Sequence, residues 1–286
     1  MPSNLDKRLH AYRDDLADVS LEGKVKATRF VTGEAATIKA HFVDLLKEPR
    51  EGSGLNTQII HGHDVMVFER KNGWAWVQRV DDGYVGYCRE DCLTSDASIA
   101  THMVLAPRTF LYPTADLQHP RVGYRSMGSK ISVADKATTR GTDYLILDTG
   151  EAVIAGHAIE LGDWKSDPVS VAETLLYTPY LWGGDTGFGI DCSGMVSTAN
   201  MLCGKTVLRD SDMQAASIGD VLDTDFTDLK RGDLVFWKGH VGMMMDQKNL
   251  LHSNGNTMNV AIEDLAGAIK RIGYLYGQPT IARRPE

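Results

Sequence analysis

Asp191-Cys192-Ser193-Gly194 is the stretch from which the fold and chemistry of the last part of the chain can be inferred. It follows a glycine-rich turn that begins Tyr180-Leu-Trp-Gly-Gly-Asp, and it precedes an apolar run with helical spacing from Met195 to Leu202. The pattern predicts that Cys192 lies where a loop enters a helix. The helix dipole stabilises a thiolate at that position, and the first main-chain N–H groups of a helix have no intrahelical acceptor. Cys192 is therefore a candidate nucleophile, and its N–H is a candidate oxyanion donor.

Two histidines lie farther along the chain, on apolar runs that are predicted to be strands. His240 follows the turn at Lys238-Gly239, and His252 ends the next apolar run. Hairpin pairing of the two runs would bring the imidazoles to the same end of a sheet, where one could act as a base and the other could orient it. A lone cysteine or histidine is more often structural, but the three together predict a Cys-His-His site for acyl chemistry.

The composition is that of an ordinary globular protein. The chain has 286 residues, of which 43% are hydrophobic and 24% charged, so it can form two or three domains. A formal net charge of -8 argues against a nucleic-acid partner and does not favour an anionic membrane. No apolar secretory core appears near the N-terminus, and no run approaches the roughly 20 apolar residues that span a bilayer. A cytoplasmic location is the expectation.

The first half of the chain is predicted to contain an arm and two β domains. Leucines and a tyrosine at helical spacing predict a helical arm at 1–24 that packs on a later domain. Short β-rich runs at 36–43, 64–69, 74–80 and 84–88, separated by Asn-Gly and Asp-Gly turns, predict an all-β barrel at 25–98. Residues 99–163 resemble a weaker second copy, in which Gly141-Thr-Asp-Tyr144 corresponds to Gly73-Trp74.

Residues 164–286 are predicted to form an α+β domain. A helix should begin at Pro168 and run to Tyr177, and the Cys192 helix should follow. Apolar strands near 233–237, 241–246 and 250–253, with a C-terminal run near 279–283, predict an antiparallel sheet.

Cys88 and Cys92 are the remaining candidate ligands for a metal. They are three residues apart, but no matching Cys or His pair lies nearby in the sequence, so a zinc site is weakly supported. Two small buried residues are the preferred interpretation. Neither a metal nor an organic cofactor is expected.

Residues 165–286 resemble the NlpC-type papain-like cysteine peptidases, which cleave peptidoglycan peptides. The matching motifs are Tyr180-x-Trp182-Gly183-Gly184, Asp191-Cys192-Ser193-Gly194, Arg231-Gly232-Asp233-Leu234, Gly239-His240-Val241-Gly242 and His252. The resemblance implies that Cys192 is the nucleophile, His240 the base and His252 the orienting residue. It also implies that the hydroxyl of Tyr180 lies near the thiol and binds substrate or the oxyanion.

The barrel at 25–98 resembles a bacterial SH3-like domain. The matching motifs are Leu46-x-Glu48-Pro49, Gly73-Trp74-x-x-Val77 and Asp82-Gly83-Tyr84-x-Gly86-Tyr87. The predicted fold is therefore multidomain, with two small all-β SH3-like barrels followed by an α+β papain-like domain. SH3-like domains before such a peptidase resemble the cytoplasmic γ-D-glutamyl-L-diamino acid endopeptidases of cell-wall peptide recycling.

That resemblance implies a substrate and a set of binding residues. The substrate would be a free murein peptide with an N-terminal L-alanine, whose amine is read by carboxylates and hydroxyls. Arg209-Asp210-Ser211 resembles the family's amine-reading motif, with Asp210 on the ammonium and Ser211 on nearby main-chain groups. Ser193 is also expected to contact substrate, and Tyr84 and Glu48 match the SH3-like contribution, with Glu51 as a rival to Glu48. The structural alternatives are an N-cap for Asp210, a solvated loop for Glu48 and a barrel core for Tyr84.

The predicted activity is hydrolysis of the γ-D-glutamyl–diamino acid bond by a cysteine peptidase. An acyltransferase or amidase with the same three residues is the rival enzyme. A cell-wall-binding module without activity is the rival from another class, and a complete Cys192, His240 and His252 argues against it.

Overall fold

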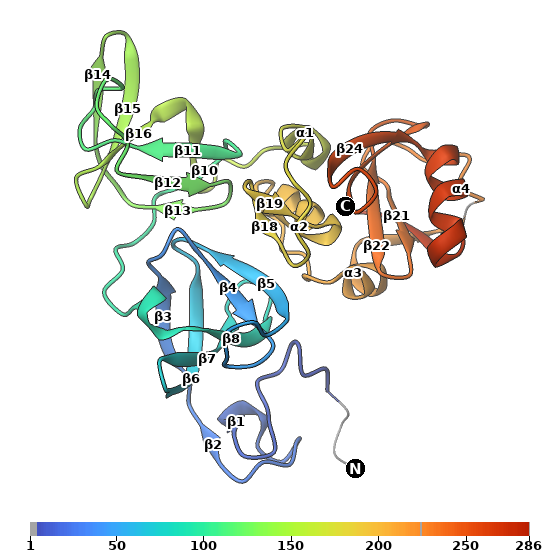
Figure 1. Cartoon of the computed structure of the whole chain (residues 1–286), viewed down its shortest axis with the longest axis horizontal. Coiled ribbons are helices and arrows are strands. Elements are labelled where there is room, and N and C mark those ends of the chain that lie inside the picture. Colours follow the sequence, from blue (N-terminus) through green and yellow to red (C-terminus); the bar gives the residue numbers. More distant parts are fainter. Residues whose placement is uncertain (1–4, 224, 286) are drawn as a thin grey trace. The chain divides into compact units, whose positions relative to one another are not determined.

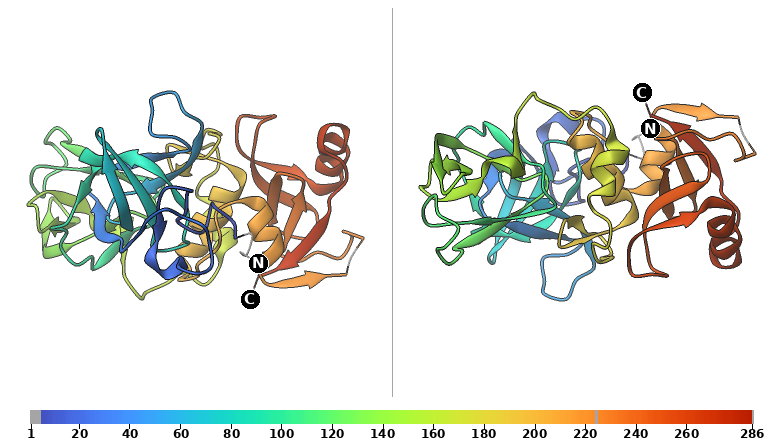
Figure 2. Two further views of the ribbon diagram at one scale, coloured as in Figure 1. Left: turned by 90° about the horizontal axis from the view of Figure 1, so that it is seen from below. Right: turned by 90° about the horizontal axis from the view of Figure 1, so that it is seen from above.

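The computed structural model describes residues 5–223 and 225–285 (Figures 1 and 2). The chain forms two compact units. The first contains the residues up to 104 together with 109–158, and the second contains 105–108 together with the residues from 159 onward. The first unit includes the described part of the predicted arm, the first predicted β domain and most of the second, whose residues 105–108 and 159–163 fall in the second unit.

The predicted first barrel is present as a seven-stranded antiparallel sheet. Its strands are β3 (Glu34–Ile38), β4 (Phe42–Leu46), β5 (Leu55–Ile60), β6 (Asp64–Lys71), β7 (Trp74–Arg79), β8 (Val85–Arg89) and β9 (Leu93–Thr94), in the order β5-β4-β8-β7-β6-β3-β9, with a 3₁₀ turn η2 (Glu90–Cys92). Asn72-Gly73 forms the predicted two-residue hairpin, because both residues adopt the positive φ angles that such a turn requires. The run 36–43 is two strands rather than one, and β5 has no clear alternation to predict it.

The predicted N-terminal helix is wrong. Among residues 5–24 the structure contains only the short strand β1 (Ala17–Asp18), which pairs with β2 (Phe30–Val31), and the 3₁₀ turn η1 (Val19–Leu21). Asp6 accepts a hydrogen bond from the N–H of Arg8, and Asp18 accepts one from Ser20, so local side-chain bonds replace a helical ladder. The expected packing is present, since Leu16 lies in a core cluster with barrel residues.

The second predicted β domain has its own apolar core and short strands. They are β10 (His102–Val104), β11 (Arg108–Leu111), β12 (Gly123–Ser126), β13 (Lys130–Ile131), β14 (Val133–Thr139), β15 (Thr142–Leu147) and β16 (Ala152–Ile154), with η3 (Ala155–His157) and β17 (Ala158–Glu160) at the boundary of the two units. β14, β15 and β16 form an antiparallel sheet, and β10 pairs with β13. The core includes Val104, Leu111 and Ile131.

The second unit is a six-stranded antiparallel sheet with helices. Its elements are α1 (Pro168–Glu173), β18 (Asp185–Thr186), β19 (Gly189–Ile190), α2 (Cys192–Met201), α3 (Ser211–Ser217), β20 (Asp220–Leu222), β21 (Leu234–Trp237), β22 (His240–Met244), β23 (Asn249–Asn254), β24 (Asn259–Asp264), α4 (Leu265–Tyr276) and β25 (Ile281–Arg284). The order in the sheet is β20-β25-β21-β22-β23-β24. The four predicted strands are present, with β20 and β24 added at the two edges.

The helices of this unit position the sheet residues discussed below. α1 starts at Pro168, as predicted, but ends at Glu173, and Tyr177 has a positive φ that no helix accommodates. α2 packs against β22 and β23. α4, which the sequence analysis missed, packs against β23 and β24 beside the sheet (Figure 1), with Leu265 and Ile272 in the core.

No helix within residues 5–223 and 225–285 is both long and apolar enough to cross a membrane.

Candidate active site

Cys192 is the first residue of α2, as its position in the sequence predicted. Asp191 is the N-cap of this helix, and its carboxylate accepts hydrogen bonds from the N–H groups of Gly194 (2.7 Å) and Gly183 (2.9 Å). Gly194 is required sterically, because a Cβ there would lie 2.4 Å from the carbonyl oxygen of Gly184. The Asp-Cys-Ser-Gly motif thus fixes a tight loop-to-helix junction with the thiol at its end.

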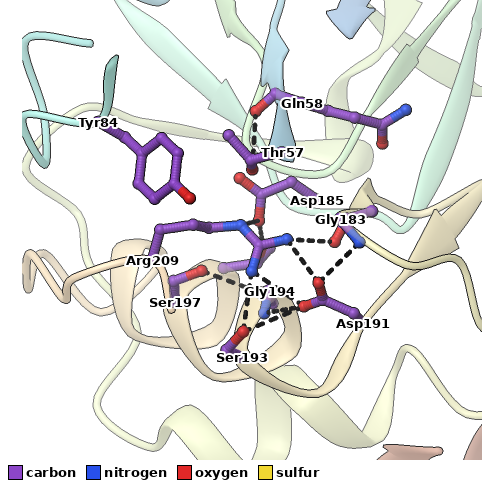
Figure 3. A network of polar contacts seen from close by, with 12 residues as sticks. Thr57, Gln58, Tyr84, Gly183, Asp185, Asp191, Ser193, Gly194, Ser197 and Arg209 are labelled. Atoms are coloured by element: carbon purple, nitrogen blue, oxygen red, sulfur yellow. Dashed lines mark hydrogen bonds and ion pairs between the residues drawn. The ribbon is translucent and has the colours of Figure 1, made fainter. Parts of the chain in front are cut away.

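A fully buried arginine holds this junction together, as Figure 3 shows. Arg209 donates two hydrogen bonds to the Asp191 carboxylate (3.0 and 2.9 Å), one to the hydroxyl of Ser193 and one to the carbonyl of Gly184. Although burial opposes its charge, Asp191 and then Asp185 hold the pKa of Arg209 above its usual value. Sequence reasoning placed Arg209 in a motif but gave it no role, and its role here is to neutralise the N-cap carboxylate.

His240 and His252 are in contact, as the hairpin prediction required. β22 pairs antiparallel with β23, and Nε2 of His240 lies 2.9 Å from Nδ1 of His252. His252 is fully buried and lies within β23 rather than at its end. Burial, followed by the neighbouring His252, lowers the pKa of His240 to about 3, so this imidazole is neutral near neutral pH.

Two residues that the sequence analysis missed, a carboxylate and an arginine, lie next to this pair of histidines. Nε2 of His252 lies 3.2 Å from Oε2 of Glu263 on β24, at an angle too poor for a strong hydrogen bond. Nε of Arg271 on α4 donates to Glu263 Oε1 at 2.9 Å. This hydrogen bond lowers the pKa of Glu263, so the carboxylate is ionised. The alternating run that begins Asn259-Val-Ala-Ile-Glu was the signal that could have placed Glu263 on a strand.

The sulfur of Cys192 is buried beside the strand that begins with His240. The N–H of Val241, the residue after His240, and the N–H of Ser193 both act on the sulfur and favour its thiolate. Burial outweighs them and raises the pKa of the Cys192 thiol to about 12. With a neutral imidazole nearby, the resting site therefore contains a thiol rather than a preformed thiolate.

The predicted binding residues of the second unit have different environments. Tyr180 is half-buried, and burial followed by the nearby Cys192 raises its pKa to about 12, which agrees with a hydroxyl close to the thiol. Ser193 is buried, and its hydroxyl donates to Asp191 and accepts from Arg209. Asp210 is the N-cap residue of α3 but forms no capping bond with its side chain, and Ser211 is the first residue of that helix.

The predicted binding residues of the first unit also differ from one another. Tyr84 is buried, whereas Glu48 is exposed and forms an ion pair with Arg50 (2.8 Å). Glu51, the rival to Glu48, is more exposed and lies 3.6 Å from Arg89. Of the two, Glu48 has the shorter ion-pair distance.

The cysteines other than Cys192 are free thiols. Cys88 is buried, which raises its pKa to about 12, and Cys92 and Cys203 are partly buried. Over residues 5–223 and 225–285, no three His, Cys, Asp or Glu side chains form a group that could hold a metal ion.

Comparisons with known proteins identify relatives of two regions of the chain. Residues 177–274 match the NlpC/P60 family, and residues 45–93 match the bacterial dipeptidyl-peptidase Sh3 domain. Dipeptidyl-peptidase 6 of Lysinibacillus sphaericus is 31% identical over 272 residues, which cover 84% of this chain and 99% of the relative. The γ-D-glutamyl-L-lysine dipeptidyl-peptidase of Bacillus subtilis is 28% identical over 240 residues, covering 75% and 77% of the two chains.

A solved structure has the same fold. The crystal structure of an NlpC/P60 family protein from Bacillus cereus aligns with a TM-score of 0.73 at 23% identity, covering 88% of this chain and 99% of that one. The similarity in sequence to the Lysinibacillus enzyme extends over nearly its whole length. The chain therefore belongs to the NlpC/P60 family of cysteine peptidases and contains an SH3 domain of the bacterial dipeptidyl-peptidase type.

Proposed function

We propose that this protein hydrolyses the γ-D-glutamyl–diamino acid bond of free murein peptides that carry an N-terminal L-alanine. The observation that carries the proposal is the contact between His240 and His252 on two adjacent strands, together with Cys192 at the start of α2, on whose sulfur the N–H of Val241 acts. The substrate class is supported by relatives named as dipeptidyl-peptidases, two of them for γ-D-glutamyl-L-lysine. We further propose that the protein acts in cytoplasmic cell-wall peptide recycling.

In the proposed mechanism Cys192 attacks the scissile carbonyl while His240 takes the thiol proton. The carbonyl carbon bonds to sulfur, the proton passes through His240 to the leaving amine, and water then hydrolyses the thioester. Burial disfavours a lone thiolate or a lone imidazolium here, so the two charges form together on transfer and attract each other. The N–H of Cys192 lies at the first position of α2, where no intrahelical acceptor exists, and serves as an oxyanion donor.

We propose that carboxylate and hydroxyl side chains bind the free amine of the substrate. Asp210 is the N-cap residue of α3, and we propose that its carboxylate pairs with the substrate ammonium group. Ser211 and Tyr180 complete the proposed contacts from this domain, and Tyr84 and Glu48 are the proposed contribution of the SH3 domain. The engaged hydroxyl of Ser193 favours a structural role for this residue instead.

We also propose that residues 99–163 form a second, divergent SH3-like domain and that the peptidase domain is papain-like. Two features support the second copy. Arg140-Gly141 joins β14 to β15 by a two-residue loop with both φ angles positive, as Asn72-Gly73 joins β6 to β7. The region also has a separate apolar core. An α+β domain with the nucleophile at a helix start and the base on a strand supports the papain-like description.

The test is mass spectrometry of L-Ala-γ-D-Glu-diaminopimelate and L-Ala-γ-D-Glu-L-Lys after incubation with the reduced protein. Each peptide is compared with the same peptide acetylated at its amine. We expect release of the diamino acid from the free peptides only. Comparison of the two free peptides then identifies the preferred diamino acid.

Three other outcomes would change the proposal. Cleavage of free and acetylated peptides alike would retain the peptidase and discard the amine reader. Cleavage of intact sacculi as fast as the free peptides would do the same, because the lactyl group blocks that amine. Cleavage of none would overturn the substrate assignment and favour another acyl group.

A further inference from the structure

Three residues of the site lie on one face of the sheet because of strand alternation. His240 pairs with Trp237, His252 is two residues from Leu250 on β23, and Glu263 on β24 pairs directly with Leu250. Trp237 and Leu250 belong to the core cluster against which α4 packs. α4 brings Arg271 to Glu263 on this face. The row His240, His252, Glu263 and Arg271 is thus a product of register and not of sequence proximity.

The contacts along this row determine which ring nitrogen carries each proton. A neutral imidazole has one N–H and one lone pair. If Nε2 of His252 carried the lone pair, it would face the ionised Glu263 oxygen at 3.2 Å, and two acceptors in a buried site repel. Nε2 therefore carries the proton, which leaves Nδ1 of His252 as an acceptor. Nδ1 lies 2.9 Å from Nε2 of His240, so His240 is protonated on Nε2.

This distribution of protons leaves one nitrogen of His240 for catalysis. With Nε2 committed to His252, Nδ1 of His240 has the free lone pair that a base requires. The other pair of tautomers would put a proton on Nδ1 of His240, which would then have no lone pair to act as a base. In a hydrogen-bonded pair of neutral histidines both pairs of tautomers are chemically equivalent until an external charge distinguishes them.

We infer that Glu263, held by Arg271, is a positioning residue that selects the catalytically competent tautomers of His252 and His240. The inference rests on the proposed roles of Cys192 and His240. The charged groups that act on the two imidazoles are Glu263 on β24 and Arg271 on α4. Arg271 disfavours protonated imidazoles, and Glu263 opposes this effect at His252. Burial lowers the pKa of His252 to about 4 although Glu263 acts to raise it.

The first experiment uses the unmutated protein and does not depend on any substrate. Long-range ¹H–¹⁵N NMR near neutral pH distinguishes protonated from unprotonated ring nitrogens. We expect an unprotonated Nδ1 and a protonated Nε2 on both His240 and His252. Protonation of Nδ1 on either residue would overturn the inference, even if the peptides of the proposed function were never cleaved.

The second experiment compares Glu263→Gln with Glu173→Gln. Glu173 is the matched control, because it forms a similar partly exposed pair with an arginine, Arg231 (3.1 Å), away from the histidines. Loss of a partner that orients an active-site histidine typically costs about tenfold to a hundredfold in activity. We expect a fall of that size in kcat for Glu263→Gln, little change in KM, and a mixture of tautomers on His240. The control should match the unmutated protein.

The pH profile separates positioning from mere loosening of the structure. Removal of the carboxylate lowers the proton affinity of the imidazoles, so the acid limb of kcat/KM should move to lower pH. Loss of packing would instead admit water and move that limb upward, toward the ordinary histidine value. An upward shift, or equal kcat and tautomers in Glu263→Gln and Glu173→Gln, would overturn the inference.

Discussion

The two arginine–carboxylate pairs of the site have different depths and different roles. Arg209 and Asp191 have side chains that are 1% and 12% exposed, whereas Arg271 and Glu263 are 31% and 26% exposed. The deep pair bonds to main-chain groups at the start of α2, and it fixes the backbone that presents Cys192. The shallower pair contacts the imidazole of His252 through Glu263.

The comparison indicates that the burial of an ion pair determines whether it contributes mainly to stability or to the electrostatics of a neighbouring residue. A buried pair is costly to break because the remaining charge has no water, so such a pair stabilises one geometry. A partly exposed pair contributes little to stability but still imposes an electric field on a buried neighbour. Substitutions in the Arg209–Asp191 pair should therefore affect mainly stability, and substitutions in the Arg271–Glu263 pair should affect mainly activity.

Cys192→Ala should have the largest effect, because it removes the proposed nucleophile. Loss of a nucleophile in such a site costs on the order of 10⁶-fold in kcat. Peptide binding and thermal stability should stay close to those of the unmutated protein, because the change removes only a sulfur atom. Mass spectrometry and calorimetry measure the two, and retained turnover would contradict the proposed nucleophile.

Arg209→Met should break the buried ion pair with Asp191. The Asp191 carboxylate would be buried without its partner, which typically costs about 3–5 kcal/mol in the free energy of unfolding. Arg271→Met should cost about 1 kcal/mol or less, since the pair is partly exposed. Urea unfolding of both variants checks the contrast. Equal losses would show that depth does not distinguish the two pairs.

The pH dependence of activity should test whether His240 is neutral in the resting site. Because the pKa of His240 is lowered to about 3 from 6.5, the base stays unprotonated as pH falls below 6.5, and the acid limb of kcat/KM should lie below that value. The raised pKa of Cys192 places any alkaline limb above 9.0. A pH–rate profile on the free peptide measures both limbs, and an acid limb at or above 6.5 would contradict a buried neutral His240.

Ser193→Ala should have the smallest effect. Loss of the hydroxyl removes one hydrogen bond from Arg209 and one to Asp191, which costs about 1 kcal/mol in stability. We expect kcat and KM to change by less than about twofold if the residue is structural. A large rise in KM alone would restore Ser193 to the substrate-binding set.

The sequence by itself determined the local features of this protein. The Asn72-Gly73 hairpin and the Asp191-Cys192-Ser193-Gly194 junction follow from short-range geometry, because positive φ angles, tight approach and capping select particular residues. Strand periodicity also placed His240 and His252 near each other, since a short hairpin has few alternative registers. Residues 5–24 do not form the predicted helix although their apolar residues have helical spacing, because the Asp6 and Asp18 side chains accept hydrogen bonds from nearby main-chain N–H groups.

Only the tertiary structure decided the partners of those residues. Arg209 reaches Asp191 from a separate loop, and Arg271 reaches Glu263 from a helix that packs on the far strand of the sheet. Such charged contacts leave no periodic trace in the sequence, because a single arginine or glutamate is equally compatible with a solvated surface. Their role comes from the water that the fold excludes around them, and that exclusion is a property of the packed domain.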